Sequence, residues 1–481
     1  MTLYDSLRRR FRSSPSNHTV RRARGSRRAT VFGVSVTAVA IALCGELLAA
    51  DSPTLAQLAE TNGAYMGTEL TQNLLSQPTV TNIAGTQFDM VTPGNEMKWD
   101  TVEPSRGTFN FGPGDSIVAF AQAHHMRIRG HNLVWHSQLA GWVTALPLNQ
   151  VQAAMVNHVT MEATHYKGKL YAWDVVNEPF EENGALRADV FFQAMGSGYI
   201  AAALRAARAA DPAAKLYLND FNIEGIGTKS NAMFTLVQSL IAQGVPIDGV
   251  GFESHFILGQ VPSTLQANMQ RFADLGLDVA ITELDDRMQL PATSANLTRQ
   301  ATEFGNVVKA CLAVSRCVGV TQWGVGDADS WIPGAFSGFG AATLYDGNYQ
   351  PKPAFSAVAL ALGATSAPPP PPPPPAGPCQ VNDVVNAWNT GLTANMTLTN
   401  TGTTTINGWT LGFALPGGQI ITSGWNAAYS PTNGQVAAAN LSYNGVLAPG
   451  ASTTIGFQAT HTGNAGAPTL FTLNGATCTI R

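Results

Sequence analysis

Residues 170–179 read LYAWDVVNEP, a short apolar run that ends in a polar pair. The run Leu170–Val176 has the length and composition of a buried β-strand, and Asn177 and Glu178 stand at its carboxyl end. The same arrangement recurs along the chain, where short apolar runs end in polar or aromatic residues and helical patterns lie between them. This recurrence decides the fold class.

Eight such runs fall between residues 51 and 363, with amphipathic helical patterns such as Tyr199–Ala210 between them. Eight strand-and-helix repeats in a segment of this length predict a (β/α)8 barrel. A doubly wound open sheet is the alternative, but no glycine-rich phosphate loop follows an early strand. The predicted strands are Ala64–Gly67, Phe88–Thr92, Arg127–Val134, Leu170–Val176, Lys215–Leu218, Gly249–Phe252, Asp278–Leu284 and Gly319–Trp323.

Composition divides the rest of the chain. Pro368–Pro375 is an unbroken run of prolines, which adopts an extended conformation and acts as a spacer. We therefore assign residues 364–378 to a proline-rich linker. In residues 379–481 only Asp383 and Arg481 are charged, and apolar residues alternate with polar ones. This pattern predicts a small all-β sandwich module.

Residues 1–50 predict a signal peptide. Nine arginines lie between Arg8 and Arg28, and the apolar run Val31–Cys44 and the pair Ala49-Ala50 follow. A basic segment, a short apolar segment and small residues are the layout of a secretory signal. A transmembrane anchor is the alternative, but a span needs roughly 20 apolar residues and this run has about 14. We expect a secreted, extracellular protein with no membrane contact after cleavage.

The charge balance argues against nucleic acid as a partner. The signal holds nine of the 27 basic and two of the 31 acidic residues, so 18 basic and 29 acidic residues remain, a net charge of −11. Binding to phosphates needs clustered positive charge.

Four cysteines follow the signal, and four cysteines allow three disulfide pairings. The proline linker separates the first two from the last two, which selects Cys311–Cys317 and Cys379–Cys478. Metal binding is the alternative, but these cysteines have no CxxC spacing and no histidine at ligand spacing.

Polar side chains gather where the predicted strands end. The loops after the strands form the open face of such a barrel, so these side chains should meet at one mouth. Glu178 ends the fourth strand and Glu283 the seventh, and the two carboxylates should face each other. Such a pair can cleave a glycosidic bond, with one acid and one nucleophile or base. Metal ligation and structural ion pairing are alternatives.

Four motifs of the barrel segment stand in register: NEMKW at 95–99, GHNLVWH at 130–136, WDVVNEP at 173–179 and ITELD at 281–285. In order and spacing they resemble family 10 glycoside hydrolases, which are retaining β-1,4-xylanases on (β/α)8 barrels. The likeness covers residues 51–363. It implies that Glu178 is the acid/base and that Glu283 is the nucleophile.

The resemblance also implies contacts to the substrate. Asn177 should bind the sugar 2-hydroxyl, and His255 should orient the nucleophile. Glu253 departs from the pattern, because the family often has glutamine there. A third carboxylate near the nucleophile favours protonation of one of the group, and its effect on pH dependence and on sugar contacts stays open. The expected contacts and walls on the nonreducing side are Asn95, Lys98, His131, Gln138, Trp323 and Trp331.

Residues 379–481 carry the stretches WNTG at 388–391, GWTL at 408–411 and FTLNG at 471–475, with a cysteine at each end. They resemble a family 2 carbohydrate-binding module. The resemblance implies a flat aromatic strip that stacks on cellulose, in which Tyr443 replaces a more usual tryptophan. Trp409 alternates with Leu411 and Phe413 and reads as core. The strip would be Trp388, Trp425 and Tyr443.

We therefore expect a secreted, monomeric xylanase that binds xylan and cellulose and uses no cofactor and no metal. Two alternatives remain open. One is a β-1,4-glucanase or mixed xylanase/cellulase on the same scaffold, since xylose and glucose units differ by one hydroxymethyl group. The other is a non-catalytic carbohydrate-binding protein on an inactive barrel.

Overall fold

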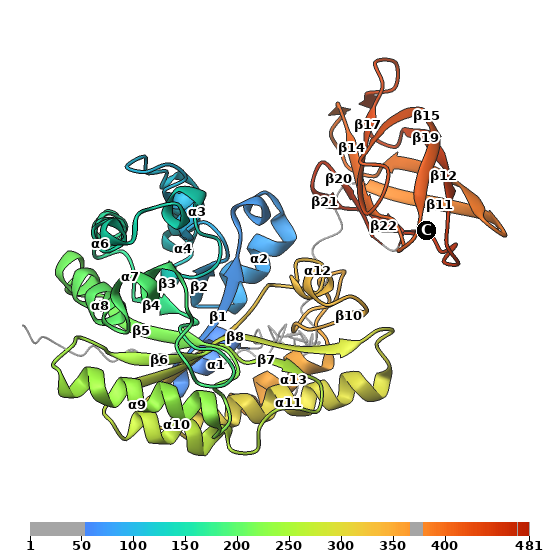
Figure 1. Cartoon of the computed structure of the whole chain (residues 1–481). Helices are drawn as coiled ribbons and strands as arrows, with labels where there is room; N and C mark the ends of the chain where they lie inside the picture. Colours follow the sequence, from blue (N-terminus) through green and yellow to red (C-terminus); the bar gives the residue numbers. More distant parts are fainter. Residues whose placement is uncertain (1–52, 366–378, 469, 481) are drawn as a thin grey trace, which may run out of the picture. The chain divides into compact units, whose positions relative to one another are not determined.

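The computed structural model describes residues 53–365, 379–468 and 470–480. The predicted signal peptide, residues 1–50, lies outside the described residues, and so do residues 366–378, most of the predicted linker. The described residues form a barrel and an all-β module (Figure 1).

Eight parallel strands close into the predicted (β/α)8 barrel. Each barrel strand pairs with the next barrel strand along the chain, and β9 pairs with both β8 and β1, which closes the barrel. The short β7 is not a barrel strand, so β6 pairs directly with β8. Two short strands, β7 (His255–Ile257) and β10 (Phe339–Gly340), pair with the outer half of β8. The barrel strands are β1 (Tyr65–Leu70), β2 (Met90–Pro93), β3 (Arg127–Trp135), β4 (Ala172–Asn177), β5 (Lys215–Asp220), β6 (Gly249–Phe252), β8 (Asp278–Gln289) and β9 (Cys317–Gln322).

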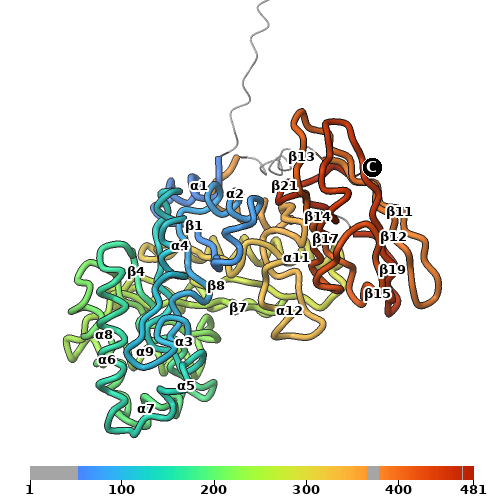
Figure 2. Tube along the Cα trace, turned by 90° about the horizontal axis from the view of Figure 1, so that it is seen from above, coloured from blue at the N-terminus to red at the C-terminus, as the bar shows by residue number. Residues whose placement is uncertain are grey.

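Helices cover the outside of the barrel, and Figure 2 shows the chain passing around it from α1 and α2 in blue through α8 in green. On α8, the side chains of Ile200, Ala203, Leu204 and Ala207 are buried while Arg205 is exposed, which is the spacing of one apolar helical face. Burying one such Leu or Ile side chain stabilises the fold by about 1.5–3 kcal/mol. No helix of the described ranges is long and apolar enough to cross a bilayer.

The helices of the barrel unit are α1 (Leu55–Thr61), the 3-10 helix η1 (Gln72–Ser76), α2 (Pro78–Gln87), α3 (Trp99–Val102), α4 (Gly112–Ala123), α5 (Gly141–Thr144), α6 (Leu148–His165), α7 (Val190–Met195), α8 (Gly198–Ala210), α9 (Thr228–Ala242), α10 (Leu265–Ala273), α11 (Ser294–Leu312), α12 (Ile332–Ala335) and α13 (Pro353–Ala361).

A layer of side chains fills the barrel below its mouth. Tyr65 of β1 packs in this layer with Tyr217, Ala172 and neighbours from other strands. Successive residues of a strand point to opposite faces of the sheet, so Gly67 and Glu69 follow Tyr65 on the inward side. Inward residues near the carboxyl ends of the strands therefore face the open mouth.

The module is built from two five-stranded sheets and one two-stranded sheet, β13–β18. On β12 the side chains of Leu392, Ala394, Met396 and Leu398 are buried in alternation, which places the core on one face of the strand. The strands are β11 (Cys379–Trp388), β12 (Gly391–Asn400), β13 (Ile406–Asn407), β14 (Thr410–Ala414), β15 (Ile420–Trp425), β16 (Ala427–Ser430), β17 (Gln435–Asn440), β18 (Val446–Leu447), β19 (Ser452–Thr460), β20 (Phe471–Leu473), β21 (Ala476–Thr477) and β22 (Thr479–Ile480).

Both predicted disulfides are present. Cys311–Cys317 joins the end of α11 to the start of β9, and Cys379–Cys478 joins the first strand of the module to its last residues. The pairing expected from the position of the linker is therefore confirmed.

Candidate active site

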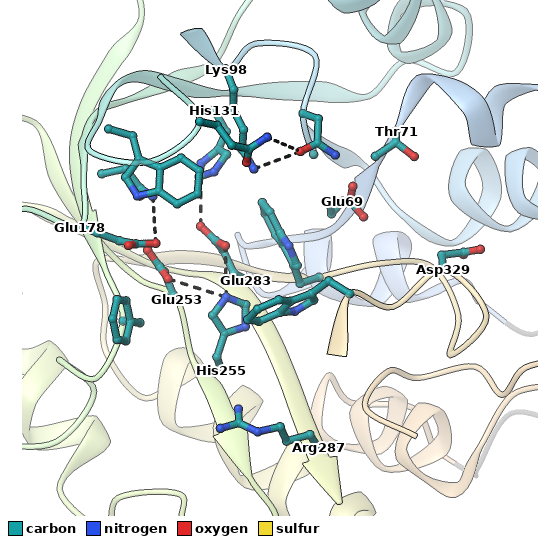
Figure 3. Close-up of a pocket in the computed structure, with 18 of the residues that line it drawn as sticks. Glu69, Thr71, Lys98, His131, Glu178, Glu253, His255, Glu283, Arg287 and Asp329 are labelled. Carbon is teal, nitrogen blue, oxygen red and sulfur yellow. Dashed lines mark hydrogen bonds and ion pairs between the residues drawn. The ribbon is translucent and has the colours of Figure 1, made fainter. Parts of the chain in front are cut away.

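One cavity of about 610 Å3 lies at the carboxyl ends of the barrel strands (Figure 3). Every residue that the sequence predicted for catalysis or sugar binding in the barrel lines it: Asn95, Lys98, His131, Gln138, Asn177, Glu178, Glu253, His255, Glu283, Trp323 and Trp331. Residues from six of the eight barrel strands, or from the loops that follow them, thus converge on one space.

Glu283 is held as a buried carboxylate on β8. Its Oε1 accepts a hydrogen bond of 2.8 Å from Asn219 Nδ2, and its Oε2 lies 3.3 Å from His255 Nε2. Burial acts to raise its pKa, but His131 and the hydrogen bond from His255 outweigh burial and hold the pKa below its usual value. The group is therefore ionised and available as a nucleophile.

His255 bridges Glu283 and Asp285. Its Nδ1 lies 2.8 Å from Asp285 Oδ2, an oxygen that also accepts a 2.8 Å hydrogen bond from the Trp331 indole. Burial alone would lower the pKa of His255, but Asp285 and Glu283 raise it to about 10. The imidazolium thus donates to both carboxylates and fixes the Glu283 side chain. Asp285 could have been found from the sequence, because it lies two residues after Glu283 and residues two apart on a strand point to the same face.

Glu178 has the opposite electrostatic setting. It follows β4 with a left-handed backbone, φ 50°, and its N–H donates to Asn219 O at 2.8 Å. Burial raises its pKa, the Trp135 indole N–H lowers it, and the negative charge of Glu283 raises it further, so the net shift is upward. Glu178 therefore keeps its proton at a pH where Glu283 has lost its own. A pair of acids with pKa values pushed apart is what an acid and a nucleophile require.

Glu253 is the third carboxyl of this group. Its Oε1 accepts from Asn219 Nδ2 at 3.1 Å, and its Oε2 lies 3.7 Å from His255 Nε2. Burial and then the charges of Glu283 and Glu178 raise its pKa well above the usual value, so it carries a proton. Ligand atoms of Glu253, His255 and Glu283 lie within 4.8 Å of one another. Because His255 is protonated and donates, the group suits hydrogen bonding better than metal ligation.

His131 contacts a buried ion pair formed by Asp174 and Arg129. His131 Nδ1 lies 3.1 Å from Asp174 Oδ2, and Arg129 Nε donates to the same oxygen at 2.9 Å. Burial disfavours the Asp174 anion, but Arg129 outweighs it and holds the pKa of Asp174 below its usual value. Arg129 and Asp174 were not predicted to be site residues from the sequence. One sequence feature could have indicated Arg129: it lies two residues before His131 on β3, and residues two apart on a strand point to the same face.

Polar groups from two loops meet on another wall of the cavity. Lys98 Nζ and Gln138 Nε2 both donate to Asn95 Oδ1, at 3.3 and 3.2 Å. Two indoles stand near the histidines: the rings of Trp323 and His131 are 5.2 Å apart, and those of Trp331 and His255 are 4.9 Å apart. Hydroxyl-binding groups beside aromatic faces form a surface suited to sugar rings.

Of the three aromatic residues predicted to form a strip on the module, Trp388 and Trp425 lie on a sheet surface. Trp388 covers Gly391, and Trp425 covers Gly456, because a Cβ on either glycine would lie 2.6 or 2.3 Å from the indole. Tyr443 is 70 % exposed, and its hydroxyl donates to Asn426 Oδ1 at 3.0 Å, next to Trp425 in the chain.

Gly391 and Gly456 belong to the neighbouring strands β12 and β19, and the pairing register puts them on the same face of that sheet. The two indoles therefore share one face. Trp409 is buried, and its indole donates to Asn444 O, as expected of a core residue.

The barrel and its two acids define a class of protein, a (β/α)8 hydrolase that cleaves glycosidic bonds. The sequence model of glycosyl hydrolase family 10 matches residues 54–361, and that of a cellulose binding domain matches residues 379–478. The chain belongs to glycosyl hydrolase family 10.

Relatives in that family are similar over the barrel. An endo-1,4-beta-xylanase of Agaricus bisporus is 51 % identical over 298 residues, which cover 61 % of this chain and 90 % of the relative. Endo-1,4-beta-xylanase A of Phanerodontia chrysosporium is 49 % identical over 303 residues, 62 % of this chain and 74 % of the relative.

Solved xylanase structures are similar to this chain as well. Xylanase 10B of Thermotoga petrophila in complex with xylobiose is 36 % identical, with a TM-score of 0.64, and the match covers 65 % of this chain and 98 % of that one. A glycosylated endo-beta-1,4-xylanase of Gloeophyllum trabeum is 45 % identical, with a TM-score of 0.62, over 64 % and 98 % of the two chains.

Proposed function

We propose that this protein is a retaining endo-β-1,4-xylanase in which Glu178 is the acid/base and Glu283 the nucleophile. The observation that carries the proposal is the opposite shift of the two carboxyl pKa values in one cavity, upward for Glu178 and downward for Glu283. The xylanase relatives named above support xylan as the substrate. The relatives and structures give no support to the alternative β-1,4-glucanase activity.

The two groups divide the reaction into two displacements. In the first, the Glu178 carboxyl gives its proton to the glycosidic oxygen while a Glu283 oxygen forms a bond to C1, and the C1–oxygen bond to the leaving sugar breaks. In the second, water attacks C1 and gives its proton to Glu178, and the bond between C1 and Glu283 breaks. The product keeps the β configuration because C1 is inverted twice.

The change in role of Glu178 follows from electrostatics. The charge of Glu283 raises the pKa of Glu178 in the free enzyme. Once Glu283 is esterified that charge is gone, so the pKa of Glu178 falls and the carboxylate can act as a base. His255 keeps its proton throughout, since Asp285 still faces it.

The residues around the pair take supporting roles in this proposal. Asn177 binds the 2-hydroxyl of the sugar over Glu283, and the Asn95–Lys98–Gln138 cluster binds sugars on the nonreducing side. The module binds cellulose through Trp388, Trp425 and Tyr443, and the match of residues 379–478 to a cellulose binding domain supports this role. We further propose that the chain is exported and acts as a monomer, and its two disulfides fit an oxidising compartment.

Proton NMR of xylan hydrolysis tests the mechanism. The purified chain should release new reducing ends from xylan first as the β-anomer, with the α-anomer appearing later by mutarotation. A first product in the α form would show inversion and refute the two-step mechanism. Release of sugar from cellulose or β-glucan at a rate equal to that from xylan would refute the substrate assignment.

A further inference from the structure

Glu69 places a carboxyl group in the cavity that the proposed mechanism does not use. Glu69 lies near the end of β1 and lines the cavity. Its side chain is on the same inward face of the strand as Tyr65, which packs deeper in the barrel. Its side chain is 7 % exposed. Figure 3 shows it beyond Glu283 as seen from Glu178, near Thr71 and Asp329.

The surroundings leave this carboxyl free for a ligand. Within the described residues, hydrogen bonds reach the backbone of Glu69 but not its carboxyl. The neighbouring Glu96 differs, because its two oxygens accept from the backbone N–H groups of Gln72 and Asn95 at 2.7 and 3.0 Å and so hold the loop. A buried polar group without a partner costs free energy unless a ligand satisfies it.

Gly94 makes room for the Glu69 carboxyl. A Cβ at position 94 would lie 1.8 Å from Glu69 Oε1, so no side chain at 94 is compatible with this position of the carboxyl. Gly94 directly precedes Asn95, which accepts from Lys98 and Gln138 in the nonreducing-side cluster. Glu69 therefore faces the same part of the cavity as that cluster.

We propose that Glu69 is a further specificity-determining residue, whose carboxyl binds a hydroxyl of the second sugar from the cleaved bond on the nonreducing side. The inference rests on the proposed xylanase function. Burial, followed by the charges of Glu96 and Asp329, raises the pKa of Glu69 to about 8, although Lys98 opposes this. At pH 6 the neutral carboxyl can both donate and accept, which matches a sugar hydroxyl.

Two aryl glycosides test the proposal. Nitrophenyl β-xyloside places one sugar on the nonreducing side of the cleaved bond, and nitrophenyl β-xylobioside places two. At pH 6, Glu69→Ala should lower kcat/KM for the xylobioside about tenfold, the effect of one lost hydrogen bond in a dry site. The value for the xyloside should stay within about twofold of wild type. Glu69→Gln keeps a donor and an acceptor, so both values should stay within about threefold.

Gly94→Ala provides an independent arm, because its methyl group displaces the flexible end of Glu69. It should reproduce the loss seen with Glu69→Ala, and the double variant should lose no more than either single one. The control is Gly141→Ala, where an added Cβ would meet no atom within 4 Å.

Equal losses on the two glycosides, or no loss on the xylobioside, would overturn the role of Glu69. A wild-type chain that cleaves neither glycoside nor xylan would instead overturn the proposed function itself.

Discussion

Glu283 should be indispensable because it alone among the three clustered carboxyls is held ionised. His255 and Asn219 donate to its two oxygens, and Glu178 and Glu253 both have raised pKa values. Glu283→Gln keeps the shape and the hydrogen bond from Asn219 but cannot form the ester. We expect kcat on xylan to fall at least about 10^4-fold, or about 5.5 kcal/mol. Adsorption to cellulose is the control and should not change; hydrolysis near the wild-type rate would refute the assignment.

Glu253 should make the barrel less stable as the pH rises. Its folded pKa is raised, so the folded protein keeps a proton that the unfolded chain releases above about pH 4.3. The unfolded state then binds fewer protons, and the free energy of unfolding falls with pH. Each pH unit between the unfolded and the folded pKa of Glu253 lowers the free energy of unfolding by up to about 1.4 kcal/mol.

Glu253→Gln removes that titration and should stabilise the protein, by an amount that grows between pH 5 and pH 8. Urea unfolding at three pH values measures it, with exposed Glu60→Gln on α1 as the control. A stability difference that stays constant or shrinks as the pH rises would contradict the raised pKa of Glu253 in the folded protein.

The residues that line the cavity were largely predictable, but the residues that support them were not. The positions of Glu178 and Glu283 in the cavity follow from strand ends and motifs. The ion pair between Arg129 and Asp174 depends on the register of β3 against β4, which puts His131 opposite Asp174. A single sequence does not reveal that register, so Arg129 and Asp174 stayed without a role.

At the scale of elements, all eight barrel strands were predictable, but the carboxyl ends of several strands were not. β6 has its predicted bounds, Gly249–Phe252. β1 was expected to end at Gly67 but runs to Leu70, and β8 was expected to end at Leu284 but runs to Gln289. The extension contains Glu69 in β1 and Asp285 and Asp286 in β8, and these acidic residues interrupt the apolar pattern. Glu69 was missed for this reason.

The two disulfides should differ in their effect on stability. Cys379–Cys478 closes a loop with a sequence separation of 99, and Cys311–Cys317 one with a separation of 6. Chain entropy predicts a stabilisation of about 4–5 kcal/mol for the long loop and about 2 kcal/mol for the short one.

Replacing both cysteines of one bridge by serine isolates its effect, and the free energy of unfolding from urea titration measures it. The loss should be larger for the Cys379/Cys478 pair. Equal losses, or a larger loss at the short loop, would show that packing around the sulfurs outweighs chain entropy.

At the scale of the whole molecule, catalysis and cellulose binding should be separable. The described residues of the barrel hold all of the cavity lining, and those of the module hold the three aromatic side chains and a core closed by its own disulfide. A chain truncated after residue 366 loses the whole module and the proline run but no cavity residue.

The truncated chain should therefore hydrolyse soluble xylan with a kcat/KM within about twofold of the full chain, because domains with separate cores function separately. It should lose adsorption to microcrystalline cellulose, measured as the protein that remains in the supernatant after pelleting. A full-length control with Trp388→Ala and Tyr443→Ala should also adsorb less, because each aromatic face contributes on the order of 1 kcal/mol. If the truncated chain pellets as well as the full chain, cellulose binding does not reside in the module.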